Sequence, residues 1–219
     1  MATDELKRNI TSVTERVMRA ATHAGSAVTI VAASKTVPAD IINSAVEYGI
    51  KNIGENRVQE FRDKKDALIG AKWHFIGTLQ RNKAKYLVGN VVLVQSVNCA
   101  ELASEIDRLA KARGVVQDVL VEVNVANEHG KTGAPFAAVD ELVAFARSLG
   151  NLRVRGLMSV PPKDAEESAY SKLGAIYARY RDADFDTLSV GMSGDFERAI
   201  ANGSNMVRIG TAIFGRRTQ

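Results

Sequence analysis

The sequence predicts an α/β protein, a single parallel (β/α)8 barrel of the TIM-barrel type with an extra N-terminal helix. Two observations predict this architecture: eight short strand-like segments alternate with amphipathic helical segments, and the connections between them are only a few residues long. No shift in composition marks a boundary, so we expect one domain over residues 1–219. An open doubly wound sheet is the alternative, because periodicity alone does not report closure.

The order of the elements follows from the periodicity of the apolar residues. Leu6, Ile10, Val13 and Val17 recur at helical spacing, which predicts a helix over residues 3–24. Strands are expected at residues 28–33, 51–54, 73–76, 91–95, 116–125, 152–160, 187–190 and 206–209. Helices are expected between them at residues 38–49, 56–67, 80–88, 98–109, 135–150, 164–181 and 194–202. Asn98, followed three residues later by Glu101, resembles a capping box.

Composition excludes several classes of protein. The chain has 46% hydrophobic and 25% charged residues, and no apolar run approaches the roughly 18 residues of a transmembrane helix. The N-terminus lacks the apolar core of a signal peptide and Cys99 is the single cysteine, so we expect a cytoplasmic protein without disulfides. The formal charge of +4 is scattered along the chain, and the three histidines lie far apart. These patterns argue against nucleic-acid binding and against a metal site.

Two loops near the C-terminus have the composition of an anion-binding site. In a parallel barrel the functional face is the carboxyl end of the strands, and the loops after strands seven and eight often hold phosphate. Residues 191–195 follow the seventh strand and offer glycine backbone together with the Ser193 hydroxyl. Residues 208–215 follow the eighth strand with small side chains beside Arg208. The alternative is a pair of ordinary tight turns.

Lys35 lies at the carboxyl end of the first strand. In a barrel mouth its amine would be partly desolvated, and desolvation together with a nearby arginine favours the neutral amine that forms a Schiff base. A lysine, a phosphate cradle and an arginine that can face a ring nitrogen are the parts that pyridoxal phosphate requires. By spacing alone, a lysine at this position is more often a surface residue whose amine reaches solvent.

Six segments carry a resemblance to a known family, and together they span nearly the whole chain: residues 31–36, 54–60, 73–83, 155–161, 191–195 and 206–215. The sequence strongly resembles the pyridoxal phosphate homeostasis protein family, also called the proline synthase co-transcribed family. The resemblance implies a fold like the N-terminal barrel of alanine racemase, with pyridoxal 5'-phosphate (PLP) held as a covalent aldimine on Lys35. It also implies that Ser193, Gly210 and Thr211 hold the phosphate, with Gly194 adding an amide.

Three further candidate residues follow from the same resemblance and from position. Arg208 matches the racemase-like arginine that faces the pyridine nitrogen, and its fixed charge should keep that nitrogen unprotonated. Asn56 and Gln59 follow the second strand, where they either line the open side of the cofactor or serve as helix-capping and surface residues. Thr78 and Gly194 differ from the residues common at these positions in the family. We expect these differences to affect the fine geometry of the site and not the identity of the cofactor.

The resemblance implies a cofactor carrier rather than an enzyme. Racemases with this barrel add a β-rich domain that supplies a catalytic tyrosine, and this chain ends at Gln219. A lysine without an opposing acid-base group should bind, store and deliver the cofactor instead of turning over amino acids. We therefore expect no catalytic residues, a role in PLP homeostasis and PLP-dependent apo-enzymes as acceptors. We also expect a monomer, because a closed barrel has no free strand edges.

Two other functions remain open, together with two minor candidate residues and one basic segment. The protein is alternatively a weak PLP-dependent amino-acid racemase or lyase, or a phosphate-binding barrel without covalent attachment. His74 fits a satisfied core histidine better than a base. Lys131 fits a solvated loop lysine better than a residue that assists cofactor transfer, and residues 81–85 fit a solvated helix face.

Overall fold

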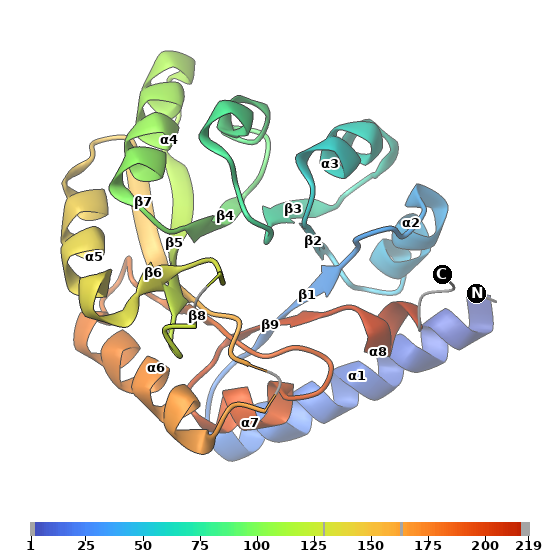
Figure 1. Ribbon diagram of the computed structural model, residues 1–219. Coiled ribbons are helices and arrows are strands. Elements are labelled where there is room, and N and C mark those ends of the chain that lie inside the picture. Colours follow the sequence, from blue (N-terminus) through green and yellow to red (C-terminus); the bar gives the residue numbers. More distant parts are fainter. Residues whose placement is uncertain (1–2, 129, 163, 216–219) are drawn as a thin grey trace.

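The computed structural model describes residues 3–128, 130–162 and 164–215. Figure 1 shows strands at the centre of the molecule and helices around them. All the pairings are parallel, and the ring runs β1, β2, β3, β4, β5, β7, β8, β9 and back to β1. The strands are β1 Thr29–Ala33, β2 Asn52–Glu55, β3 Lys72–Phe75, β4 Leu93–Val97, β5 Gln117–Asn124, β6 Ala134–Pro135, β7 Leu152–Met158, β8 Thr187–Ser189 and β9 Met206–Ile209. The closed ring confirms the predicted barrel and excludes the open sheet. The short β6 pairs only with the last two residues of β5.

Helices follow the strands around the outside of the ring (Figure 1). They are α1 Thr3–Ala24, α2 Ala39–Glu47, α3 Val58–Lys64, α4 Ala100–Arg113, α5 Val139–Ser148, α6 Glu167–Tyr180, α7 Phe196–Ala201 and α8 Thr211–Phe214, with 3-10 helices η1 Lys65–Ala67, η2 Arg81–Tyr86 and η3 Phe136–Ala138. The predicted N-terminal helix is confirmed. It buries the expected stripe and packs beside α7 and α8, where Arg16 bonds Glu197.

The core has two layers because side chains alternate along each strand. The larger cluster fills the space between the ring and the helices. A smaller one fills the inside of the barrel and contains Val31, Ile76, Leu93, Leu120, Met158 and Met206. The inner positions therefore identify which strand residues face the interior. Among the described residues, even the longest helix, α1, is too polar to provide the apolar length that a bilayer crossing requires.

Two local expectations are wrong. The helix after β4 starts at Ala100 with Cys99 as its N-cap and has no side-chain cap hydrogen bond. Asn98 therefore lies one residue before the cap and Glu101 one residue short of the third helical position, so a capping box cannot form. The segment predicted as a helix over residues 80–88 is the 3-10 helix η2. A tighter turn is typical of so short a connection between two strands.

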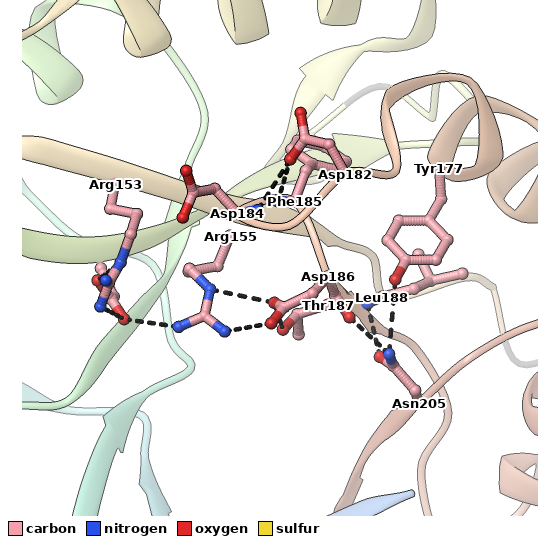
Figure 2. Close-up of polar contacts among 11 residues, drawn as sticks. Arg153, Arg155, Tyr177, Asp182, Asp184, Phe185, Asp186, Thr187, Leu188 and Asn205 are labelled. Atoms are coloured by element: carbon pink, nitrogen blue, oxygen red, sulfur yellow. Dashed lines mark hydrogen bonds and ion pairs between the residues drawn. The ribbon is translucent and has the colours of Figure 1, made fainter. Parts of the chain in front are cut away.

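The amino-terminal end of the barrel is held by paired charges (Figure 2). Arg155 lies between Asp186, whose Oδ1 is 3.0 Å from its Nε, and Asp118, whose Oδ2 is 3.1 Å from its Nη1. Arg153 makes a two-pronged contact with the same Asp118 at 2.8 and 2.9 Å. Asn205 ties the neighbouring strands by accepting from the Leu188 amide at 2.8 Å. These groups satisfy one another, which is the pattern of a structural network.

Candidate functional site at the carboxyl end of the barrel

The carboxyl end of the barrel collects the predicted cofactor residues. Lys35 follows β1, Asn56 follows β2, Ser193 and Gly194 follow β8, and Gly210 and Thr211 follow β9. Because every strand runs in the same direction, these positions belong to one end of the ring.

Lys35 continues the inward-facing series of β1. Strand pairing extends beyond Ala33, since the Ser34 amide donates to the Gly54 carbonyl at 2.9 Å. Val31 and Ala33 belong to the cluster inside the barrel, and alternation places Lys35 on that side. The side chain is half-buried, and its amine has no hydrogen-bond or ion-pair partner within residues 3–128, 130–162 and 164–215. The structure therefore leaves a free amine at the barrel mouth.

A buried carboxylate fixes the two loops that carry Lys35 and Asn56. Glu55 is fully buried at the end of β2. Its Oε1 accepts from the Asn56 amide at 2.7 Å, and its Oε2 accepts from the Ser34 hydroxyl at 3.1 Å. Lys64 of α3 donates to the same Oε2 at 3.1 Å, so the charge of the carboxylate is balanced inside the protein.

Lys64 extends this network to both neighbours of Lys35. Its ammonium donates to the Ser34 carbonyl at 3.2 Å and to Glu60 Oε2 at 2.8 Å. The same Glu60 oxygen accepts from the Thr36 amide at 2.7 Å. Thr36 has a φ of 64°, a left-handed conformation that is unfavourable for a β-branched residue and needs such support. Burial opposes ionisation of Glu60, but the bonds from Lys64 and Thr36 lower its pKa.

Arg208 crosses the barrel interior from β9. Its side chain is 4% exposed. One terminal nitrogen donates to the Ser189 carbonyl and hydroxyl, both at 2.7 Å, and the other to the Ser159 carbonyl at 2.8 Å. Burial lowers the pKa of Arg208 to about 10, which still leaves the guanidinium charged at neutral pH.

A chain of hydrogen bonds continues from Arg208 through the barrel. The Ser189 hydroxyl donates to Gln95 Oε1 at 2.7 Å, and Gln95 Nε2 lies 3.2 Å from His74 Nδ1. His74 Nε2 in turn lies 3.2 Å from the Asn52 side-chain oxygen. Burial lowers the pKa of His74 to about 4, so the ring is neutral at neutral pH. This confirms His74 as a satisfied core histidine, and the chain fixes the Ser189 hydroxyl that holds Arg208.

Glu122, which the sequence did not single out, is an ionisable group in the same end of the barrel. It is 4% exposed and lies on β5 two residues beyond Leu120, which faces the interior. Oε1 accepts from the Thr132 hydroxyl at 2.6 Å, but Oε2 has no partner within the described residues. Burial raises the pKa of Glu122, against the opposing effects of Thr132 and Arg208. An unpaired buried carboxyl oxygen is costly, and it indicates a place that a ligand can complete.

The loops after β8 and β9 are joined through Ser193. Its hydroxyl accepts from the Ala212 amide at 3.2 Å. The backbone amides of Ser193 and Gly194 have no acceptor among the hydrogen bonds of the described residues. Gly191 has a φ of 102°, and a Cβ there would lie 2.8 Å from the Ala199 Cβ, so only glycine allows this loop to fold closely over α7. The two loops thus present free amides and a hydroxyl together.

Two other sequence candidates do not join the site. Gln59 is exposed and its amide donates to Asp63 at 2.7 Å. Lys131 is exposed and forms an ion pair with Glu128. The sequence offered no local signal for Glu55, Lys64 or Glu122, because their contacts join separate strands, helices and loops.

Comparison with known proteins identifies the family. Residues 3–218 match the family model described as alanine racemase, N-terminal domain. The pyridoxal phosphate homeostasis protein of Aquifex aeolicus is 42% identical over 95% of this chain and 96% of its own length. The protein of the same name from Escherichia coli K12 is 36% identical over 98% of this chain and 97% of its own length. The chain belongs to the pyridoxal phosphate homeostasis protein family.

Solved structures agree with this membership. PipY of Synechococcus elongatus with PLP bound has a TM-score of 0.83 and 27% identity, covering 96% of this chain and all of PipY. A Bifidobacterium adolescentis protein of unknown function has a TM-score of 0.89 and 32% identity, covering 97% of this chain and 95% of its own. Alanine racemase of Clostridium difficile has a TM-score of 0.78 at 15% identity and covers 57% of the racemase chain, which shows the shared barrel fold.

Proposed function

We propose that this protein binds pyridoxal 5'-phosphate at the carboxyl end of its barrel and serves intracellular PLP homeostasis as a carrier of the cofactor. The observation that carries the proposal is the free Lys35 amine at the mouth of the same barrel that contains the buried Arg208. The bound PLP of PipY and the names of the family members support it.

The residues present fit each part of the cofactor. Free amides at Ser193 and Gly194 suit phosphate oxygens, and Gly210 and Thr211 provide backbone and a hydroxyl in the adjoining loop. Arg208 is held by three acceptors, so it presents a fixed positive charge toward a ring nitrogen. The unpaired Glu122 oxygen and Asn56 offer further polar contacts at the barrel mouth.

PLP supplies an aldehyde that condenses with a lysine amine. Lys35 is the amine that we assign to this covalent attachment. The network of Glu55, Lys64 and Glu60 would hold its turn in place, because the residues on both sides of Lys35 are hydrogen-bonded to it. Because the amine has no ion-pair partner among the residues that the structure describes, no salt bridge to them must break before attachment.

We propose a non-catalytic role, with PLP-dependent apo-enzymes as acceptors, in a monomeric, single-domain protein of the cytoplasm. Turnover of an amino acid requires a second acid-base group opposite the lysine. Within the described residues, His74 is buried and neutral, and Tyr170 bonds Asp195 at 2.6 Å with its pKa raised to about 12, mainly by burial. Neither is suited to exchange protons at neutral pH. Glu122, whose pKa burial raises, is a further ionisable group at this end of the barrel, and the turnover assay below tests whether it acts as an acid-base group.

The test is the visible absorption spectrum of the purified protein after addition of PLP, before and after borohydride reduction. We expect a band that reduction removes, and mass spectrometry should place the added mass on the peptide containing Lys35. Lys35→Ala should abolish the band. Lys65→Ala should retain it, because Lys65 is a partly exposed lysine that pairs with Asp66. An unaltered spectrum in the wild type would overturn covalent binding, and racemisation or lyase turnover by the loaded protein would overturn the non-catalytic role.

A further inference from the structure

A cavity lies beside Asn56, between the segment that follows β2 and the segment that follows β3. Its volume is about 290 Å³. Its walls include Asn56, Arg57 and Arg62 from the first segment and Thr78, Gln80 and Lys83 from the second. Apart from Arg62, these residues belong to the stretches that carry the family resemblance, yet only Asn56 has been assigned to the cofactor.

The cavity is lined by cations whose charge is largely uncompensated. Within the described residues, neither Arg62 nor Lys83 forms an ion pair, and no Asp or Glu lines the cavity. Arg57 is the exception, with a terminal nitrogen 3.8 Å from Glu60 Oε1, near the outer limit of an ion pair. Glu60 is itself engaged at 2.8 Å by Lys64, so it neutralises Arg57 only weakly.

The position of Arg62 is fixed without a carboxylate. Its guanidinium lies over the Tyr86 ring, with the central carbon 4.5 Å from the ring centroid. Stacking of this kind holds the plane of the guanidinium while leaving its N–H groups available. The amides of Asn56 and Gln80 and the Thr78 hydroxyl supply neutral hydrogen-bonding groups in the same walls. Such a mixture of cations and neutral donors is suited to an oxyanion.

We infer that this cavity is a binding site for a small oxyanion, a carboxylate or phosphate borne by a small molecule. The volume equals roughly ten water molecules, which admits a small metabolite and excludes a folded chain. Guanidinium groups bind carboxylate and phosphate with the same two-pronged geometry, so the structure predicts an oxyanion of either kind. Because Asn56 borders both this cavity and the proposed cofactor site, an anion bound here would lie next to a residue proposed to contact the cofactor.

The experiment is a titration followed by backbone amide NMR, with inorganic phosphate in one arm and acetate in the other. This readout separates the two anion sites. Shifts at residues 57–62 and 80–86 report the cavity, and shifts at residues 193–194 report the loops proposed to hold the cofactor phosphate. We expect saturable shifts in the first group with at least one of the anions, and the arm that binds more tightly identifies phosphate or carboxylate as the source.

Variants test whether the cations are responsible. Arg62→Gln and Lys83→Gln should each weaken binding at the cavity by about two- to fivefold, the scale of a surface charge pair. Lys65→Gln removes a nearby exposed charge that does not line the cavity, and its affinity should equal that of the wild type. Amide shifts elsewhere in the spectrum show that each variant is folded.

Two results would overturn the inference. One is the absence of saturable shifts at residues 57–62 and 80–86, and the other is the same anion affinity for Arg62→Gln, Lys83→Gln and Lys65→Gln. Failure of the cofactor proposal is distinguishable, because it would leave the cavity shifts intact while the protein gained no visible band with PLP.

Discussion

The Glu55 carboxylate and the Lys64 ammonium lie 3.1 Å apart in the interior, and each is bonded to the loops that carry the proposed cofactor residues. Glu55 is fully buried and the Lys64 side chain is 12% exposed, so each charge is compensated by the other group rather than by water. A buried pair of this kind contributes little net stability relative to apolar packing, but removal of one partner is expensive. The pair instead positions two segments, the turn that carries Lys35 and the start of the loop that carries Asn56.

Lys64→Met should both destabilise the protein and slow the attachment of PLP. The substitution strands a buried carboxylate and removes the donor to the Ser34 carbonyl, at a cost of about 3 kcal/mol in the free energy of unfolding. The Lys35 turn would lose its anchor on one side, so we expect covalent attachment to slow by about tenfold or more. Urea unfolding measures the first effect and stopped-flow absorbance the second.

The matched control for this variant is Lys65→Met, which removes a neighbouring exposed charge. It should change both quantities little, because its partner Asp66 is 84% exposed. Combining Lys64→Met with Glu55→Gln should recover part of the lost stability, since the buried negative charge is then absent. Attachment at the wild-type rate in a folded Lys64→Met protein would contradict the positioning role.

Ser193→Ala should weaken PLP binding with little effect on stability. The Ser193 hydroxyl contributes one partly buried hydrogen bond to the Ala212 amide and one proposed contact to the phosphate. Loss of a hydrogen bond to a charged group corresponds to about tenfold in the dissociation constant. Fluorescence titration of PLP measures it, and pyridoxal without phosphate should bind both proteins equally. Ser168→Ala, on the exposed start of α6, is the control.

The sequence predicted the barrel because each strand and helix has its own periodic signature. Lys35, Ser193 and Arg208 could be proposed as cofactor residues from the sequence, because each stands next to the carboxyl end of a strand or in a loop rich in glycine and each lies in a segment that carries the family resemblance. The positioning residues had no such signature. Lys64 resembles any helix lysine until the fold brings it to Ser34, thirty positions away in sequence.

Local geometry also limited what the sequence could predict. Asn98 and Glu101 have the right spacing for a capping box, but the helix begins one residue later than that motif requires. The segment over residues 81–86 has helical composition and still forms a 3-10 helix, which packs against α3 and α4. Glu122 was overlooked because it lies in an apolar strand, where only the structure shows that its Oε2 has no partner among the described residues.

Gly191→Ala should destabilise the protein, whereas Gly194→Ala, in the same loop, should leave its stability nearly unchanged. At Gly191 the φ of 102° and the 2.8 Å approach to Ala199 make any side chain costly, and we expect a loss of about 2 kcal/mol or more in stability. At Gly194 a Cβ meets no atom within 4 Å, so stability should stay within about 0.5 kcal/mol of the wild type. Thermal or urea unfolding gives both values, and equal stabilities would show that the loop adapts.

Glu122→Gln should stabilise the protein at neutral pH and lose that advantage in acid. Burial raises the pKa of Glu122 in the folded state, with the Thr132 hydroxyl and the Arg208 charge acting in the opposite direction. The stability associated with its protonated form is therefore fully present below the ordinary glutamate pKa of about 4.3 and is lost as pH rises through the folded-state value. Glutamine stays neutral and still offers an acceptor to Thr132, so the variant should gain on the order of 1 kcal/mol at neutral pH.

Urea unfolding of wild type and Glu122→Gln across the pH range from acid to neutral tests this sign. The difference in unfolding free energy should be small below about pH 4 and should grow toward neutral pH. A variant that is less stable at neutral pH would mean that the attraction between the Glu122 carboxylate and Arg208 outweighs burial.

Unfolding in the presence of PLP gives a second test. If a polar group of the cofactor pairs with Oε2, PLP should stabilise the wild type more than the variant. The reason is that only the wild type has a costly carboxyl oxygen without a partner among the described residues.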